Sequence, residues 1–172
     1  MPQDGTMAKT VDANLLNPFL NATLECMQVM AGLQPERKRL FIKTSTQMHG
    51  DVAGVIGMTN GVTGSCVVSF PESLARRIIA KLMMEDDPAK LTKEMILDGV
   101  GEIANMVGGG AKRKLANGGT RFDISTPTVL YGKPIQLYNP PDTISIAAEF
   151  SVHPEWPETF LFELATRLVE KP

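Results

Sequence analysis

The sequence has 172 residues, 43% of them hydrophobic and 21% charged, with a formal net charge of −2. These values are typical of a soluble globular domain and exclude a large basic surface for a nucleic-acid backbone. The apolar runs are strand-sized and fall short of the roughly 20 residues that span a bilayer. No secretory signal is visible, and the two cysteines form no metal-binding or disulfide pattern, so the sequence predicts a cytoplasmic protein.

The N-terminal part of the chain predicts a short lead followed by a helix. Residues 1–11 are expected to be flexible, and residues 12–172 are expected to form a single domain because no interior linker divides them. Asp12 is suited to cap a helix, and leucines recur after it at helical spacing. Gly32 is suited to end this helix.

A strand, a hairpin and a second helix are predicted next. Residues 40–48 alternate weakly in hydropathy, which favours a strand. Asn60 and Gly61 stand between two segments rich in β-branched residues, and both tolerate the positive φ of a tight hairpin turn. A helix opened by Pro71 follows, with an apolar stripe at helical spacing.

The second half predicts a long helix followed by strands. The helix begins near residue 91 and continues to about 115, and the strands after it are 121–132, 133–139 and 143–152. Residues 158–171 fit both the alternation of a strand and the spacing of a helix, and we favour an edge strand. Together these elements predict an α+β fold with a largely antiparallel sheet, and the order of elements suggests two duplicated halves.

The long helix contains "GEIANMVGGGAKRKL", and its two faces differ in character. At 100° per residue, one arc of roughly 60° holds only apolar side chains, which predicts a buried stripe. This stripe comprises Ile96, Val100, Ile103 and Val107. The opposite arc holds Asp98, Glu102, Asn105 and Gly109. Glu102 and Asn105 are therefore predicted to stand side by side in solvent, which taken alone is also what an ordinary solvated helix face would show.

The glycines of this helix need an explanation, because each costs roughly 1 kcal/mol relative to alanine in a helix interior. Either the helix ends at the glycine triplet or another backbone approaches closely there, and the helix formers in "AKRKL" favour continuation. The missing side chains would leave a flat shelf for a partner protein beside Glu102 and Asn105. The partner-binding residues expected on this surface are Asp98, Gly101, Gly108 and Gly109.

A carboxylate and an amide three residues apart suit only some kinds of chemistry. No serine, cysteine or histidine lies nearby in the sequence to act as a nucleophile, and one carboxylate with one amide supplies too few oxygen ligands for a metal. An amide both accepts and donates hydrogen bonds, so Asn105 could hold a water molecule in one orientation. Glu102 could pair with a lysine of a partner. Hydrolysis of a phosphoryl group needs little more than such positioning.

The chain resembles the CheC/CheX/FliY class of chemotaxis phosphatases, and most of all its CheX branch. The resemblance rests on "DANLLNPFLNATLE", "VIGMTNGVTGSCVVSF", "GEIANMVGGGAKRKL" and "DISTPTVLYGK". It implies a CheC-like fold of pseudo-duplicated halves, with long helices packed on a largely antiparallel sheet. It also implies hydrolysis of the aspartyl-phosphate of a CheY-like response regulator in two-component signalling, with Glu102 and Asn105 as the catalytic pair.

In this family, Asn105 would orient the attacking water and Glu102 would anchor a lysine of the receiver. The receiver would bring Mg²⁺, so this chain would need no cofactor or metal of its own. In the first helix, Asn21 precedes Glu25, which reverses the order of the motif and indicates a single site. The family also implies a homodimer joined along a sheet edge.

Two other functions use features of the same sequence. A non-catalytic adaptor that binds a receiver domain or a flagellar-switch protein would use the same helix face, and only the lifetime of the phosphate distinguishes it from a phosphatase. A nucleic-acid patch at residues 111–114 is disfavoured, because three cations at the end of a helix in a net-acidic chain usually complement the helix dipole.

Overall fold

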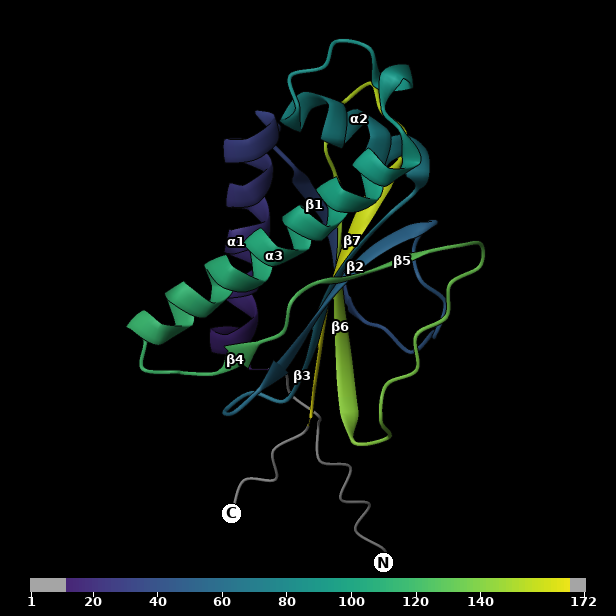
Figure 1. Cartoon of the computed structure of the whole chain (residues 1–172). Coiled ribbons are helices and arrows are strands. Elements are labelled where there is room, and N and C mark those ends of the chain that lie inside the picture. Colours follow the sequence, from purple (N-terminus) through teal and green to yellow (C-terminus); the bar gives the residue numbers. More distant parts are fainter. Residues whose placement is uncertain (1–11, 168–172) are drawn as a thin grey trace, which may run out of the picture.

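The computed structural model describes residues 12–167, in which three α-helices lie on one face of an antiparallel sheet (Figure 1). In chain order the elements are α1 (Ala13–Ala31), β1 (Glu36–Ile42), β2 (Val52–Thr59), β3 (Gly64–Phe70), α2 (Glu72–Leu82), the 3-10 helix η1 (Pro88–Lys90), α3 (Lys93–Asn117), β4 (Asp123–Ile124), β5 (Thr128–Tyr131), β6 (Thr143–Ser151) and β7 (Thr159–Arg167). The predicted flexible lead, residues 1–11, and the end of the last predicted segment lie outside the described residues. No helix among the described residues is long and apolar enough to span a membrane.

The sheet has the strand order β1-β6-β7-β3-β2-β4, and β5 also pairs with β2. Two hairpins, β2–β3 and β6–β7, meet at the centre of the sheet along β3 and β7. Each hairpin is flanked by a strand from the other half of the chain, because β1 pairs with β6 and β5 pairs with β2. This exchange of flanking strands fits the predicted pseudo-duplication, and the mixed α+β class is confirmed.

Local signals in the sequence explain where several elements begin and end. The Asp12 carboxylate caps α1 by accepting a hydrogen bond from the Asn14 amide at 2.9 Å, and Gly32 ends that helix in the left-handed region with φ 62°. The predicted hairpin turn has positive φ at both Asn60 and Gly61, at 57° and 134°. A side chain on Gly61 would also collide with the backbone of Arg121.

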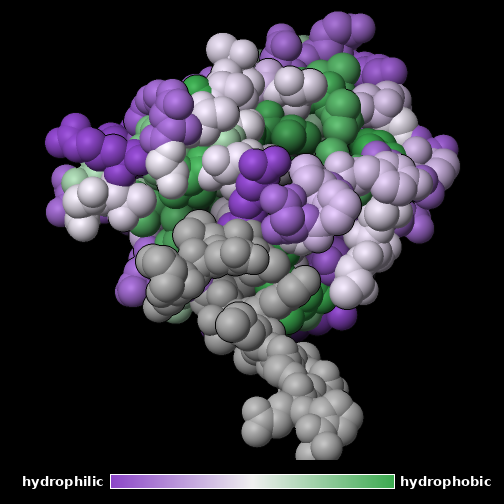
Figure 2. Space-filling model, turned by 90° about the horizontal axis from the view of Figure 1, so that it is seen from below, coloured by the Kyte–Doolittle hydropathy of each residue, from purple (hydrophilic) through white to green (hydrophobic). Residues whose placement is uncertain are grey.

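The core lies between the sheet and the helices. Val52, Ile56 and Met58 of β2 face the helices, whereas Ala53 and Val55 face the other side of the sheet. That second side is covered by chain segments rather than by helices, through the apolar residues Met48, Ile135 and Leu137. The surface seen from below mixes hydrophilic and apolar areas (Figure 2). Most of the large apolar side chains of the described residues are buried.

One predicted strand is misplaced and another is absent. The first strand is β1, earlier than the predicted 40–48, and its charged residues obscured the pattern because this edge strand is exposed on both faces. Residues 133–139 form no strand. Only an isolated bridge between Gln47 and Gln136 is present there, because this segment lies across the second side of the sheet.

The last strand, β7, was predicted correctly as a strand but wrongly as an edge. It lies between β6 and β3 in the interior of the sheet. Its buried Glu163 would be costly alone, but Lys43 Nζ lies 3.4 Å from this carboxylate and Ser145 Oγ donates a hydrogen bond to it at 2.6 Å. These partners come from distant parts of the chain, and they make a charged residue compatible with a central strand.

Candidate active site

The site lies on α3, which is continuous through the whole glycine-rich segment. Thr92 caps the helix by accepting a hydrogen bond from the Met95 amide at 3.2 Å, and the helix ends only at Asn117. The alternative in which the glycine triplet ends the helix is therefore wrong. Close packing accounts for most of the glycines.

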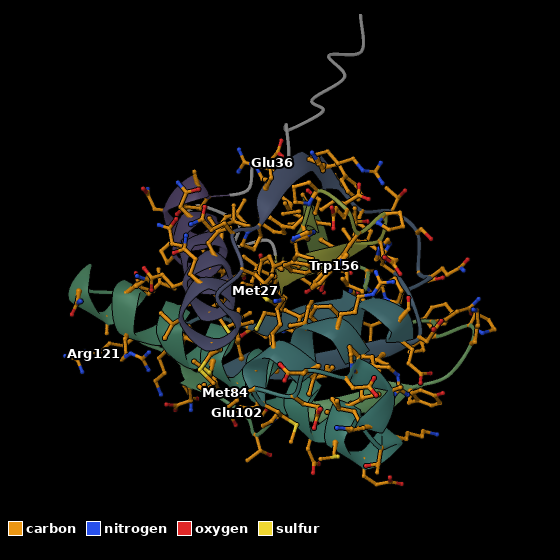
Figure 3. All side chains as sticks on the ribbon, turned by 90° about the horizontal axis from the view of Figure 1, so that it is seen from above. Met27, Glu36, Met84, Glu102, Arg121 and Trp156 are labelled. Atoms are coloured by element: carbon orange, nitrogen blue, oxygen red, sulfur yellow. The ribbon has the colours of Figure 1, made fainter. Side chains whose placement is uncertain are left out.

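The two faces of α3 are as the angular analysis predicts. Ile96, Val100, Ile103 and Val107 are at most 1% exposed and pack in the core. Glu102 and Asn105 are both exposed on the opposite face. Figure 3 shows Glu102 part-way along α3, whereas Arg121 lies past the C-terminal end of this helix.

The Glu102 and Asn105 side chains do not help to hold the fold together. Among residues 12–167, neither side chain makes a hydrogen bond or an ion pair, although other carboxylates near the helices do. A carboxylate and an amide that are solvated and unpaired keep all their hydrogen-bonding capacity for another molecule. The arrangement can therefore bind a cation with Glu102 and orient a water molecule with Asn105.

Two of the glycines predicted to bind a partner are buried, which corrects that prediction. A Cβ on Gly101 would lie 3.1 Å from Val129 of β5, and one on Gly108 would lie 3.3 Å from Ile56 of β2. These glycines allow α3 to pack closely on the sheet. They therefore cannot belong to an exposed docking surface.

The remaining glycines of α3 also divide into those packed against another element and one that is not. A Cβ on Gly110 would meet Ala22 of α1 at 3.1 Å, and one on Gly99 would meet the Ile79 side chain of α2 at 2.5 Å. Only Gly109 of the triplet is half-exposed and free of contact with another element. Asp98 is also exposed, so Asp98 and Gly109 remain on the face that carries Glu102 and Asn105.

The chain's own cysteines are poor nucleophiles. Burial raises the pKa of the Cys66 thiol to about 12. Burial, and secondly the nearby Glu102 carboxylate, raise the pKa of the Cys26 thiol to about 11. Both thiols are therefore protonated at neutral pH, and only a thiolate attacks phosphorus efficiently. Within residues 12–167, no three histidine, cysteine or acidic side chains are grouped so that they could hold a metal.

The surroundings of the site suit a large partner better than a small ligand. A hollow of about 540 Å³ lies near the ends of α1 and α2, lined by residues that include Ala31, Arg77, Met84 and Trp156. Neither Glu102 nor Asn105 lines it. The exposed pair stands instead on the outer face of a helix, where a protein surface can approach it.

Sequence reasoning missed the ion pairs that hold α3 to its neighbours. Lys112 Nζ lies 3.4 Å from the Asp123 carboxylate at the start of β4, and Lys114 Nζ lies 2.7 Å from the Glu25 carboxylate on α1. A run of cations signals an exposed helix end, but only the folded chain brings these carboxylates beside it. The ion pairs connect α3 to β4 on one side and to α1 on the other.

Comparison with known proteins identifies the family to which this site belongs. Residues 52–151, more than half of the chain, match the family described as chemotaxis phosphatase CheX. The chain belongs to this family. The matched residues include the hairpin β2–β3 and all of α3, and the expectation of a phosphatase, a hydrolase, is confirmed at the level of the family.

Individual relatives agree with the family assignment. The CheY-P phosphatase CheX of Thermotoga maritima is 27% identical over 127 residues, which cover 74% of this chain and 81% of that protein. A CheC-like superfamily protein from Shewanella sp. PV-4 is 32% identical, with a TM-score of 0.81 and coverage of 91% of this chain and 99% of that one. CheX in the CheX-CheY-BeF₃-Mg²⁺ complex of Borrelia burgdorferi is 24% identical and shares the fold, with a TM-score of 0.75 over 92% of this chain and 99% of that one.

Proposed function

We propose that this protein hydrolyses the aspartyl-phosphate of a CheY-like response regulator. The observation that carries the proposal is the pair of side chains, Glu102 and Asn105, that stand exposed and unpaired together on a continuous helix. Membership of a phosphatase family, and the naming of the Thermotoga maritima relative as a CheY-P phosphatase, support this substrate.

The reaction that we propose divides the work between two proteins. Asn105 accepts a hydrogen bond from a water molecule and holds it in line with the phosphorus, while Glu102 pairs with a lysine of the receiver and fixes the docking. Attack by the water breaks the bond between phosphorus and the aspartate oxygen, which releases inorganic phosphate and the free carboxylate. The protonated thiols of this chain leave water as the nucleophile.

The metal is expected to come from the partner. The Borrelia burgdorferi complex contains CheX, CheY, BeF₃ and Mg²⁺ together. Mg²⁺ held by the receiver would stabilise the negative charge of the phosphoryl group as the bond breaks. In this division, the receiver contributes the substrate and the charge stabilisation, and this chain contributes the aligned water.

The partner surface that we propose centres on Glu102 and Asn105 and includes Asp98 and Gly109. Asp98 lies one turn before Glu102, and Gly109 lies one turn after Asn105, so all four share one exposed face. Gly109 adds no side chain of its own to this face, and the Arg113 Nη1 atom lies 3.6 Å from the position that a Cβ there would occupy.

The test is a decay measurement on phosphorylated receiver domains. A receiver labelled with ³²P is mixed with substoichiometric amounts of this protein, in Mg²⁺ and then after chelation of Mg²⁺. We expect repeated turnovers and a faster loss of label only when Mg²⁺ is present. An adaptor would bind the receiver and leave its phosphate lifetime unchanged, and that result would overturn the proposal.

We also propose a homodimer joined along a sheet edge. The support is β1, which lies at the edge of the sheet and exposes Leu40 and Ile42 to 44% and 56%. An unpaired edge strand with apolar side chains is suited to pairing with a second copy. Light scattering after gel filtration measures the mass directly, and a monomer at micromolar concentration would contradict this proposal.

A further inference from the structure

The run of cations near the end of α3 contains one residue with a different role from its neighbours. Lys112 and Lys114 are each paired with a carboxylate of another element, Asp123 and Glu25. Arg113 stands between them, is exposed, and makes no hydrogen bond or ion pair within residues 12–167. Its positive charge is therefore not used to hold α3 in place.

The Arg113 side chain lies back along α3 towards the candidate site. Its Nη1 atom is 3.6 Å from the position that a Cβ on Gly109 would occupy, and its Nη2 atom is 3.8 Å from the equivalent position at Gly110. Long side chains in helices generally cover the turn that precedes them, and the two glycines offer a bare helix surface for this guanidinium. Arg113 thus covers the helix one turn before its own Cα.

This placement sets the distance between the guanidinium and the amide of Asn105. Gly109 follows Asn105 by four residues, so the guanidinium is displaced from Asn105 by about one helical turn, roughly 5–6 Å along the axis. A water held by the Asn105 amide would be about 3 Å from that amide, and the phosphorus that it attacks would lie beyond the water, outward from the helix and not along its axis. Arg113 is therefore placed to contact the rim of a docked partner's pocket rather than the atom attacked by water.

The charges along the exposed face of α3 are arranged by sign. Carboxylates precede Asn105, at Asp98 and Glu102, and the unpaired guanidinium follows it at Arg113. A partner that places a lysine against Glu102 and a carboxylate against Arg113 fits in one direction only, because the reversed orientation would oppose like charges. Arginine suits the second contact because its planar guanidinium can bind a carboxylate with two parallel hydrogen bonds.

We propose that Arg113 is a docking residue, which binds a carboxylate on the rim of the receiver's phosphorylated pocket and fixes the direction in which α3 lies on the receiver. This inference rests on the proposed function. It assigns Arg113 to recognition of the partner, whereas Asn105 acts on the water. Its effect should therefore appear in the concentration of receiver needed, and not in the rate at saturation.

The test is to reverse the charge with Arg113→Glu and to measure both receiver binding and phosphate release. We expect KM and Kd for the phosphorylated receiver to rise about tenfold, with kcat within about twofold of the wild type. Arg113→Lys should recover part of the affinity, because it restores the charge but not the planar fork. Thermal melting of each variant checks that the exposed substitution leaves the fold intact.

The matched control is Arg121→Glu, which makes the same charge change past the C-terminal end of α3 (Figure 3). If both reversals raised KM equally, general electrostatic attraction would explain the effect and the inference would be wrong. A fall in kcat at unchanged KM would equally overturn it, because Arg113 would then act on the reacting groups. Should the wild type bind receivers without hydrolysis, the proposed function fails, and the Kd comparison still decides the docking role.

Discussion

The two long helices α1 and α3 lie on the same face of the sheet, and each presents an amide and a carboxylate to solvent. On α1 these are Asn21 and Glu25, and on α3 they are Glu102 and Asn105. The difference is that Glu25 is already bound, at 2.7 Å, to Lys114 of the neighbouring helix, whereas the pair on α3 is free within the described residues. Exposure is therefore not enough to make a site. A carboxylate that the fold uses for packing its own helices must lose that contact before it can serve a partner.

Among substitutions that keep the size of the side chain, Asn105→Asp on α3 is expected to lower activity the most. The substitution keeps the size of the side chain, but it removes the N–H donors and brings a negative charge towards a phosphoryl group. We expect kcat for phosphate release to fall about 100-fold, the scale on which a single positioned hydrogen-bonding group acts in catalysis. The rate of phosphate release at a saturating concentration of phosphorylated receiver gives kcat for the variant and the wild type. A variant that kept full activity would show that neither the N–H donors of Asn105 nor its neutral charge matters for phosphate release.

The next effect in size is expected from Glu102→Gln. The neutral amide cannot form an ion pair with a receiver lysine, so we expect the affinity for the phosphorylated receiver to fall about tenfold. The salt dependence of binding should also weaken, because one charge contact has gone. Titrations at two ionic strengths measure both quantities. Equal affinities for the variant and the wild type would remove Glu102 from the docking contact.

The third expected effect is on stability, and it separates the packed glycines from the exposed one. Gly99→Ala would place a Cβ 2.5 Å from the fully buried Ile79, and overpacking of this kind costs about 1–3 kcal/mol in the free energy of unfolding. Gly109→Ala meets only the Arg113 side chain at 3.6 Å, and should stabilise α3 by up to about 1 kcal/mol. Urea unfolding curves compare the two. Similar shifts of the midpoint would contradict this division of the glycines.

The smallest effect is expected from Glu25→Gln on α1. Glu25 and Lys114 are both partly exposed, and exposed ion pairs contribute about 1 kcal/mol or less to stability. We expect the free energy of unfolding to change by no more than about 1 kcal/mol and the rate of phosphate release to equal that of the wild type. A large loss of activity would mean that α1 carries a second working site, and the comparison between the helices would then fail.

The exposed pair on α3 could be predicted from the sequence because it depends on helical periodicity alone. The apolar residues from Ile96 to Val107 fix the buried side, and this places Glu102 and Asn105 on the other. The hairpin was predictable for a similar reason, since Asn60 and Gly61 specify a turn through their own backbone preferences. Both preferences depend only on residues that are close in the sequence, so contacts with distant residues do not change them.

The features that were missed depend on contacts between distant parts of the chain. Whether a glycine of α3 faces solvent or a neighbour is decided by residues such as Ile56 and Ala22, which no local pattern connects to it. The interior position of β7 depends on Lys43, which compensates the buried charge of Glu163. The pairing of Glu25, which distinguishes the two helices, likewise exists only once α1 and α3 are packed together.

The most direct test of the central claim is the rate of phosphate release by two alanine variants, Asn105→Ala and Asn21→Ala, with one phosphorylated receiver. Both substitutions remove an exposed amide from a long helix on the same face of the sheet, so their effects on solubility and stability should be comparable. The account predicts that Asn21→Ala keeps the wild-type rate. With Asn105→Ala, the receiver should lose its phosphate no faster than the receiver alone, although this variant still binds the receiver. Equal rates for the two variants would contradict the assignment of Asn105 as the residue that orients the water.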